Sequence, residues 1–568
     1  FVDFDDRLTN DATVVERVDP SLPAQGYELT ITDGGATLAA GDAAGAFYGR
    51  ATLAQLERVN DGRLPIGTIR DHPDIATRGV MLDVSRDKVP TMATVRALID
   101  RLASWKINQL QLYSEHTFAY RNHGDVHATA SPFTADEIRE LDAYCRARHV
   151  ELVPNQNCLG HMNRWLRHER YRPLALEPDG FVDEWGMARK AMTIDPANPE
   201  SLVLVRELLA ELLPLFTSRR VHVGLDEAWE LPKARMDEFL HWVATLRALP
   251  ELDGREMLMW GDMIAGDADR LRQLPEGVTV CEWGYDDWHP FAKRTALLAE
   301  CEVPFWVAPG TSSWLSIVGR MTNAIGNCRI AAEAALSNGG RGLLNTDWGD
   351  QGHLQQLPVS DPGFAYGAAV SWCLDTNADL DLAAALSVHC YDDPSGELAA
   401  AVLDLGDAHR VVTPQFPNMS TITLHLYFPQ LTLGRGLTRG LTTAELDTVA
   451  EVVANARSRA DRARSQRPDA SALVDEVQWG ADVVALLTDD ARARLGGDGT
   501  IGSVAASSRS ELANRLSSLM EQHRALWLQR NRPGGLDDSA EWLANLRRAY
   551  ESGAPDPDWG GWRVKPDR

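Results

Sequence analysis

Short apolar runs alternate with amphipathic helical stretches through the middle of the chain, beginning near residue 78. Each run is nearly continuous in Val, Leu, Ile and Met and ends in polar or aromatic residues, a pattern typical of buried parallel strands. Eight such runs cover residues 79–85, 107–115, 150–157, 221–227, 256–263, 278–285, 303–309 and 342–350. Helical periodicity follows several of them, for example at residues 92–105, 135–148, 234–246 and 329–337. Eight β/α repeats predict an α/β fold, a closed (β/α)8 TIM barrel.

The pattern changes on both sides of this barrel. Before it, residues 27–32 alternate as a strand does and residues 45–56 have helical spacing, which predicts a small N-terminal α/β domain over residues 1–72. The barrel is expected over residues 73–376. After it the strands stop, and helical periodicity continues in segments rich in Ala, Leu, Arg and Asp, which predicts a C-terminal helical domain over residues 377–568.

Composition narrows the class of protein. The chain is 44% hydrophobic and 24% charged, as soluble globular proteins are, and its formal net charge of −25 disfavours nucleic acid and anionic membranes as partners. No apolar run is long enough for a membrane span. The seven cysteines are scattered without a CxxC pair, and no signal peptide is evident, so a reducing, cytoplasmic location is expected. The sequence leaves the oligomeric state open, a homo-oligomer included.

Acidic residues at the ends of the predicted strands are the first candidates for chemistry, because TIM-barrel enzymes build their sites there. Asp226 and Glu227 close the apolar strand at residues 222–225. An unpaired charge in that place is costly unless it faces a polar cleft, so a functional pair is favoured over a structural ion pair.

Tryptophan is the second signal. The chain has 17 Trp against 13 Phe and 11 Tyr, and several of the Trp lie at strand ends. A flat indole packs against the C–H face of a sugar ring, while carboxylates and Arg hydrogen-bond to its hydroxyls. Any single Trp is as well explained by core packing, but several near one rim, among acids, favour a sugar-binding site.

These residues carry a resemblance to a known family. The motif at residues 78–86 (RGVMLDVSR), followed by residues 222–227 (HVGLDE), is similar to that of the family 20 glycoside hydrolases, the β-N-acetylhexosaminidases. Residues 44–53 resemble the end of that family's N-terminal domain, so the similarity extends over roughly residues 25–375. The C-terminal helices carry no part of it.

The resemblance implies an exo-acting, retaining enzyme for terminal β-linked GlcNAc or GalNAc in an oligosaccharide or glycoconjugate. Its substrate's own acetamide oxygen attacks the anomeric carbon and forms an oxazolinium intermediate. Glu227 would be the acid and base, and Asp226 would orient the acetamide. The other residues implied to bind or enclose the sugar are Arg78, His161, Trp260, Trp283, Trp348 and Asp350. No cofactor and no metal are implied.

The sequence also departs from the family's pattern. The family has an acid four residues before the histidine that supports the catalytic acid, whereas this chain has Asn157 before His161. Glu115 is a candidate replacement for that acid and equally a candidate for a salt bridge at the rim. The family's Tyr-x-Asp, whose hydroxyl holds the acetamide oxygen, is not evident, so Tyr285 or Trp314 is expected to take its place.

Two other functions remain open at this point. A metal-dependent barrel hydrolase would use the H-x-D-x-H motif at residues 123–127, although its place in a loop favours a solvated segment. A non-catalytic carbohydrate-binding barrel is the other alternative. Retention of both Asp226 and Glu227 disfavours it, so the sequence predicts the hexosaminidase.

Overall fold

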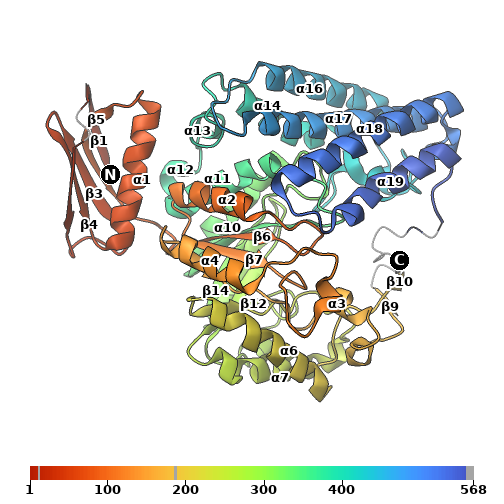
Figure 1. The fold of residues 1–568 in the computed structure, drawn as a ribbon, viewed down its shortest axis with the longest axis horizontal. Helices are drawn as coiled ribbons and strands as arrows, with labels where there is room; N and C mark the ends of the chain where they lie inside the picture. Colours follow the sequence, from red (N-terminus) through yellow and green to blue (C-terminus); the bar gives the residue numbers. More distant parts are fainter. Residues whose placement is uncertain (11–12, 184–187, 558, 560–568) are drawn as a thin grey trace.

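The structure is a computed structural model that describes residues 1–10, 13–183, 188–557 and 559. An N-terminal five-stranded sheet, in the order β1-β5-β3-β4-β2, comes first along the chain. Its strands are β1 (Val2–Thr9), β2 (Val14–Val18), β3 (Tyr27–Thr32), β4 (Gly35–Ala40) and β5 (Leu64–Asp71), and α1 (Ala43–Val59) covers one face (Figure 1). Alternation in β3 places Tyr27, Leu29 and Ile31 inward, where they pack in a core separate from that of the barrel.

A closed parallel barrel follows, as predicted. Eight strands pair in the order β11-β12-β13-β14-β15-β6-β7-β8, and a bridge between Asn155 and His222 joins the last strand to the first. The strands are β6 (Thr77–Asp83), β7 (Gln109–Tyr113), β8 (Glu151–Val153), β11 (Arg220–His222), β12 (Glu256–Trp260), β13 (Val278–Trp283), β14 (Phe305–Ala308) and β15 (Gly342–Asp347). Each lies in or overlaps one predicted run. Nearly all their residues are buried, which explains the continuous rather than alternating apolar pattern.

Helices between the strands form the outer layer of the barrel. They are α2 (Met92–Ser104), α4 (Ala135–Arg146), α6 (Pro199–Leu212), α7 (Met236–Arg247), α9 (Phe291–Glu300), α10 (Met321–Asn338) and α11 (Asp361–Trp372), with short helices and a small hairpin, β9 (Phe181–Val182) and β10 (Ala188–Arg189), in the loops. None of the helices in the described residues is long and apolar enough to cross a membrane.

The C-terminal region is helical, as predicted, and stacks against one side of the barrel (Figure 1). Its helices are α13 (Leu382–His389), α14 (Glu397–Asp407), α15 (Leu424–Tyr427), α16 (Thr443–Arg462), α17 (Ala470–Leu495), α18 (Ala506–Arg530) and α19 (Leu536–Ser552). One hydrophobic core runs from Ile75 in the barrel to Tyr550 in α19. The packing is therefore continuous between barrel and helices, and the boundary at residues 376 and 377 stays a prediction.

Candidate active site

A strained turn after β11 carries the acidic pair. Gly224, Leu225 and Glu227 have φ values of 71°, 75° and 48°, in the left-handed region. Gly224 is required because a Cβ there would lie 1.8 Å from Asn157 Oδ1. Such strain persists only where neighbouring groups hold the backbone.

Asn157 is one of the groups that hold this turn. Its Oδ1 accepts from the Leu225 N–H at 3.1 Å, and its Nδ2 donates to Asp226 Oδ1 at 3.3 Å and to the Tyr113 hydroxyl at 2.8 Å. Asn157 thus contacts Asp226 directly. At this position an amide can donate to one group and accept from another, whereas an ionised carboxylate can only accept.

His161 lies between the two acids. Its Nε2 is 3.2 Å from Asp226 Oδ2 and 3.4 Å from Glu227 Oε2. Burial disfavours the charged imidazole, but the two carboxylates outweigh it and raise the pKa of His161 well above its usual value. The same charge, together with Arg86, lowers the pKa of Asp226 against the effect of burial. Asp226 is therefore ionised beside a protonated imidazole at neutral pH.

Glu115 lies close to this histidine, with its Oε1 3.7 Å from His161 Nδ1. The same oxygen accepts from the Tyr113 hydroxyl at 3.0 Å and lies 3.5 Å from Arg86 Nε. Its supporting role toward His161 stays a prediction, and the contact with Arg86 matches the alternative salt bridge.

The structure contradicts the prediction that Arg78 binds the sugar. Arg78 lies at the start of β6, at the opposite end of the barrel from Asp226, and is fully buried. Its guanidinium donates to the carbonyls of Lys106, Ile75 and Ala76 and packs on the rings of two aromatic residues, Tyr48 and Trp372. Because a strand advances about 3.3 Å per residue, the two arginines of the motif lie at opposite ends of β6.

Arg86, which follows the end of β6, occupies the site instead. Its Nη1 pairs with Asp83 Oδ2 at 3.2 Å, and its Nε lies 4.0 Å from Asp350 Oδ1. The guanidinium is 4.8 Å from the ring centroids of both Tyr113 and Trp348. Arg86 and Asp350 together form a polar end of the site, next to an indole.

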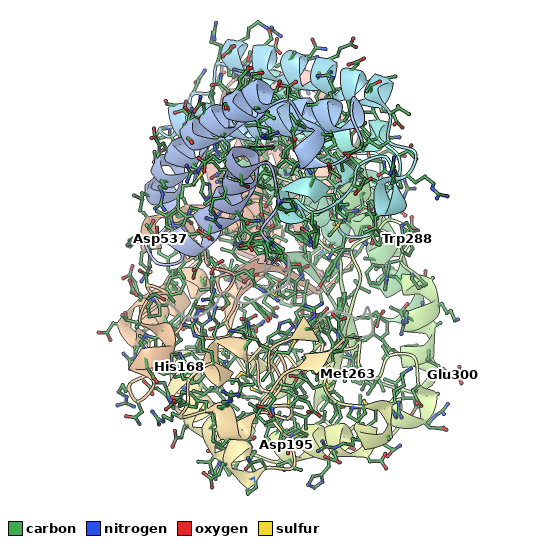
Figure 2. The ribbon with its side chains drawn as sticks, turned by 90° about the vertical axis from the view of Figure 1, so that its right-hand side faces the viewer. His168, Asp195, Met263, Trp288, Glu300 and Asp537 are labelled. Atoms are coloured by element: carbon green, nitrogen blue, oxygen red, sulfur yellow. The ribbon has the colours of Figure 1, made fainter. Side chains whose placement is uncertain are left out.

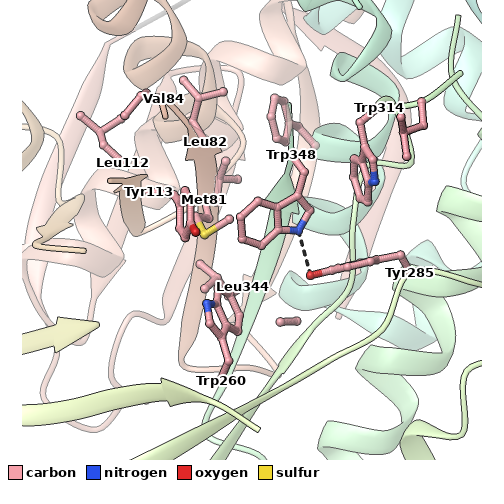
Figure 3. Close-up of a cluster of buried hydrophobic side chains, with 14 of the residues drawn as sticks. Met81, Leu82, Val84, Leu112, Tyr113, Trp260, Tyr285, Trp314, Leu344 and Trp348 are labelled. Atoms are coloured by element: carbon pink, nitrogen blue, oxygen red, sulfur yellow. Dashed lines mark hydrogen bonds between the residues drawn. The ribbon is translucent and has the colours of Figure 1, made fainter. Parts of the chain in front are cut away.

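Aromatic side chains continue from this polar end and form an apolar wall of the site. The Trp348 indole N–H donates to the Tyr285 hydroxyl at 2.8 Å (Figure 3). Trp283 stacks on Tyr285 with ring centroids 5.2 Å apart. Direct ligand contact by Trp260 and Trp314 is not borne out, since the structure leaves them 0% and 1% exposed, behind Trp348 and Tyr285. They buttress the wall, which leaves Tyr285 as the candidate for holding the acetamide oxygen.

Two carboxylates in the site were given no role from the sequence. Asp262, after β12, accepts from the Glu227 N–H at 3.0 Å and from the Trp283 indole N–H at 3.1 Å. Burial raises the pKa of Asp262 to about 7, and the charges of Asp226 and Glu227 add to this shift. Asp83 accepts from the Arg86 N–H and orients its guanidinium. Both lie at strand ends, which is the signal that could have identified them.

The H-x-D-x-H motif lies outside this cluster. His123 Nδ1 contacts the Tyr171 hydroxyl at 2.6 Å, and its Nε2 lies 3.4 Å from Glu207. His127 contacts the Tyr120 carbonyl. Within the described part of the chain, no three His, Cys, Asp or Glu side chains converge as metal ligands would.

The site combines acids on both sides of one histidine with an adjacent arginine and a wall of indoles. All of these lie at the carboxyl ends of barrel strands. This combination is typical of a glycoside-hydrolysing barrel protein. Residues 76–294 match the catalytic domain of glycosyl hydrolase family 20, and residues 4–72 match domain 2 of that family. Together the two matches cover about half of the chain. The chain belongs to glycoside hydrolase family 20.

Individual relatives are consistent with membership of this family. The chain is 32% identical over 238 residues to a beta-hexosaminidase of Akkermansia muciniphila. This match covers 37% of this chain and 48% of that protein. It is 27% identical over 206 residues to a lacto-N-biosidase of Bifidobacterium bifidum, and this match covers 36% of this chain and 18% of that protein. The match thus spans about half or less of these relatives. The fold resembles that of Streptomyces plicatus N-acetyl-beta-hexosaminidase, with a TM-score of 0.53, 23% identity and coverage of 68% and 83%.

Arg78 and Arg86 give a direct test of the corrected assignment. We expect Arg86→Ala to raise KM for a sugar substrate about 10- to 100-fold, since hydrogen bonds to a charged group contribute about 1.5–3 kcal/mol. Arg78→Ala should leave KM unchanged and lower the unfolding temperature, because it removes a buried guanidinium with three carbonyl partners. Steady-state kinetics and thermal unfolding of both variants check this. An increase in KM for Arg78→Ala alone would restore the original assignment.

Proposed function

We propose that this protein is an exo-acting, retaining β-N-acetylhexosaminidase that removes terminal β-linked GlcNAc or GalNAc from an oligosaccharide or glycoconjugate. One observation carries the proposal. His161 lies within 3.4 Å of both Asp226 and Glu227, and these two acids lie on a strained turn at the mouth of the barrel. Family membership supports the same assignment.

In the proposed reaction, Glu227 donates a proton to the glycosidic oxygen while the substrate's acetamide oxygen attacks the anomeric carbon. The bond from that carbon to the leaving group breaks, and an oxazolinium ion forms. Glu227 then takes a proton from water. The water oxygen attacks the same carbon and opens the oxazolinium ring, so the anomeric configuration is retained overall. Asp226 accepts the acetamide N–H and stabilises the positive charge that develops there.

Asn157 and His161 prepare Asp226 for this role. Asn157 donates to one of its oxygens, and His161 lies beside the other. Both contacts favour the ionised form, which is the form that can accept the acetamide N–H and oppose a developing positive charge. Tyr285 would donate to the acetamide oxygen, its own oxygen being fixed by the Trp348 indole.

Recognition of the rest of the sugar falls to the polar end of the site. Arg86 donates to the ring's outer hydroxyls and Asp350 accepts from them, so the two provide a donor and an acceptor about 4.0 Å apart. Trp348 lies between this pair and Tyr285 and presents the apolar face against which a pyranose packs.

Hydrolysis of aryl β-GlcNAc, β-GalNAc and β-glucoside by the purified protein tests the proposal, with each assay repeated in EDTA. We expect turnover of at least one N-acetylated sugar, no turnover of the glucoside, and no effect of chelator. Equal turnover of the glucoside would contradict a role for the acetamide, and activity lost with EDTA would favour a metal-dependent hydrolase.

The acid at the polar end gives the site a pH dependence. Burial raises the pKa of Asp350 to about 6, with Arg86 opposing this shift and Asp83 and Glu227 adding to it. An acid with a raised pKa is neutral below that pH, so Asp350 loses its charge as the pH falls through 6. We expect the inhibition constant of free N-acetylhexosamine to rise over this range. Asp350→Asn should weaken binding at pH 8 and remove most of the pH dependence of this inhibition constant. A variant whose inhibition constant varies with pH in parallel with that of the wild type would contradict this role.

A further inference from the structure

Two loops carry Arg86 and Asp350, the residues proposed to bind the sugar's outer hydroxyls. The arginine loop (residues 84–91) links β6 to α2 and carries Arg86, and the tryptophan loop (residues 348–356) follows β15 and carries Trp348 and Asp350. Neither the tryptophan loop nor the helices beyond it lie within the residues that the family models match. Figure 2 shows the C-terminal helices above the barrel, with Asp537 of α19 on the same face as Met263 and Trp288 from the barrel's loops.

The arginine loop is bound through its backbone to the turn between α18 and α19. The Thr91 N–H donates to the Arg530 carbonyl at 2.9 Å, and the Arg532 N–H donates to the Val89 carbonyl at 2.8 Å. Gly535 approaches so closely that a Cβ there would lie 1.9 Å from the Asp87 carbonyl oxygen. The backbone that follows Arg86, from Asp87 to Thr91, is thus fixed by residues more than 400 positions away.

The tryptophan loop packs on α19. Gly352 has a φ of 91°, and a Cβ at this residue would lie 2.3 Å from Trp542 Cδ1, so the loop lies directly against this indole. Tyr427 of α15 packs edge-on against the same indole at 5.8 Å. Burial raises the pKa of the Tyr427 hydroxyl, and the charge of Asp350 adds to this. The helices therefore reach the surroundings of Asp350 itself.

Lys88 connects both loops to the helices. Its Nζ donates to the Gln355 carbonyl at 2.6 Å and lies 5.2 Å from the Trp527 ring centroid, and the Gln355 side chain donates to the Trp348 carbonyl at 2.7 Å. The side chain is almost fully buried and lines an internal cavity together with Glu476 of α17. Burial lowers the pKa of Lys88 to about 7. A buried amine held by one carbonyl and one indole, charged or neutral, is sensitive to the spacing of the elements that supply these partners.

We propose that the C-terminal helices are a positioning part of the sugar site, with Trp542 and Lys88 fixing the two loops so that Arg86 and Asp350 reach the same sugar ring. This rests on the proposed function and assigns a role to a region that carries none of the family's motifs. Because misplacement by about 1 Å can cost up to roughly a hundredfold in rate, a loose loop would reduce recognition even with every contacting residue intact. Neither Trp542 nor Lys88 is proposed to touch the substrate.

The test compares Trp542→Ala and Lys88→Met with a matched control, Leu446→Ala. Leu446 is buried in α16, which packs on α14 and α17. Each protein is assayed with an aryl N-acetyl-β-hexosaminide and with its 4-deoxy and 6-deoxy analogues, alongside thermal unfolding. We expect the two loop variants to raise KM for the parent about tenfold, to change kcat by less than about threefold, and to discriminate less between the parent and at least one analogue.

Leu446→Ala should lower the unfolding temperature without changing this discrimination. Trp542→Phe keeps a ring on Gly352 and should retain most of the wild-type KM, so it is the conservative control. Trp542→Leu removes the ring but keeps an apolar side chain, and it replaces Trp542→Ala if that variant does not fold. Unchanged KM and discrimination in both Lys88→Met and a folded protein with Ala or Leu at position 542 would overturn the inference. A wild-type protein that turns over no N-acetylhexosaminide would instead overturn the proposed function.

Discussion

Glu227→Gln should lower kcat/KM by about 10²- to 10⁴-fold for substrates with a sugar or alkyl leaving group, the range that a positioned general acid contributes. A dinitrophenyl leaving group departs without protonation, so its glycosylation step should be far less affected. With that substrate the second step, which needs a base, should become limiting. Leaving-group dependence of kcat/KM in both proteins measures this.

Glu230→Gln is a matched control, since this glutamate lies three residues further on and accepts from the backbone N–H groups of Met192 and Thr193. It should not change the leaving-group dependence. An equal loss for Glu227→Gln on good and poor leaving groups would contradict its role as the acid.

Asp226→Asn is expected to lower kcat by about 10²- to 10³-fold, the size of effect seen when one group that stabilises transition-state charge is removed. KM should change little, because the charge of Asp226 matters most when positive charge develops on the acetamide. The substituted amide also loses its attraction to the charged imidazole of His161, 3.2 Å away. Steady-state kinetics on one aryl N-acetylhexosaminide separates the two parameters.

Asp237→Asn serves as the control, because this exposed acid at the start of α7 lies outside the site. It should leave both parameters unchanged. A variant at Asp226 with unchanged kcat and a raised KM would make Asp226 an ordinary binding residue.

The barrel was predictable from sequence because parallel strands are buried on both faces and therefore appear as continuous apolar runs. Asp226 and Glu227 were predictable for a related reason, since charge at the end of such a run has few structural explanations. The same rule applied strictly would have selected Arg86 over Arg78, because only Arg86 follows the end of β6. Motif similarity alone does not indicate which of the two arginines lies at the carboxyl end of the strand.

Other features depend on contacts between distant residues. Asn157 interacts with the backbone of Leu225 and with Asp226, across 68 and 69 positions, which no local pattern reveals. Trp260 ends β12 and Trp314 lies in the loop after β14, and only the packing of Trp348 and Tyr285 against them shows that they are enclosed. The contact of Trp542 with Gly352 could not be predicted, because nothing in the helical periodicity of α19 indicates which surface it covers.

Substrate-assisted catalysis is tested most directly by altering the nucleophile within the substrate. Aryl β-glucosaminides with acetyl, fluoroacetyl, difluoroacetyl and trifluoroacetyl groups on the 2-amine present a carbonyl oxygen of decreasing nucleophilicity while changing little in size. If the acetamide oxygen attacks the anomeric carbon, with Asp226 orienting it and Glu227 as the acid, kcat/KM should fall steeply and steadily along the series. A rate that is flat across the four substrates would contradict this mechanism and require a nucleophile from the protein or from water.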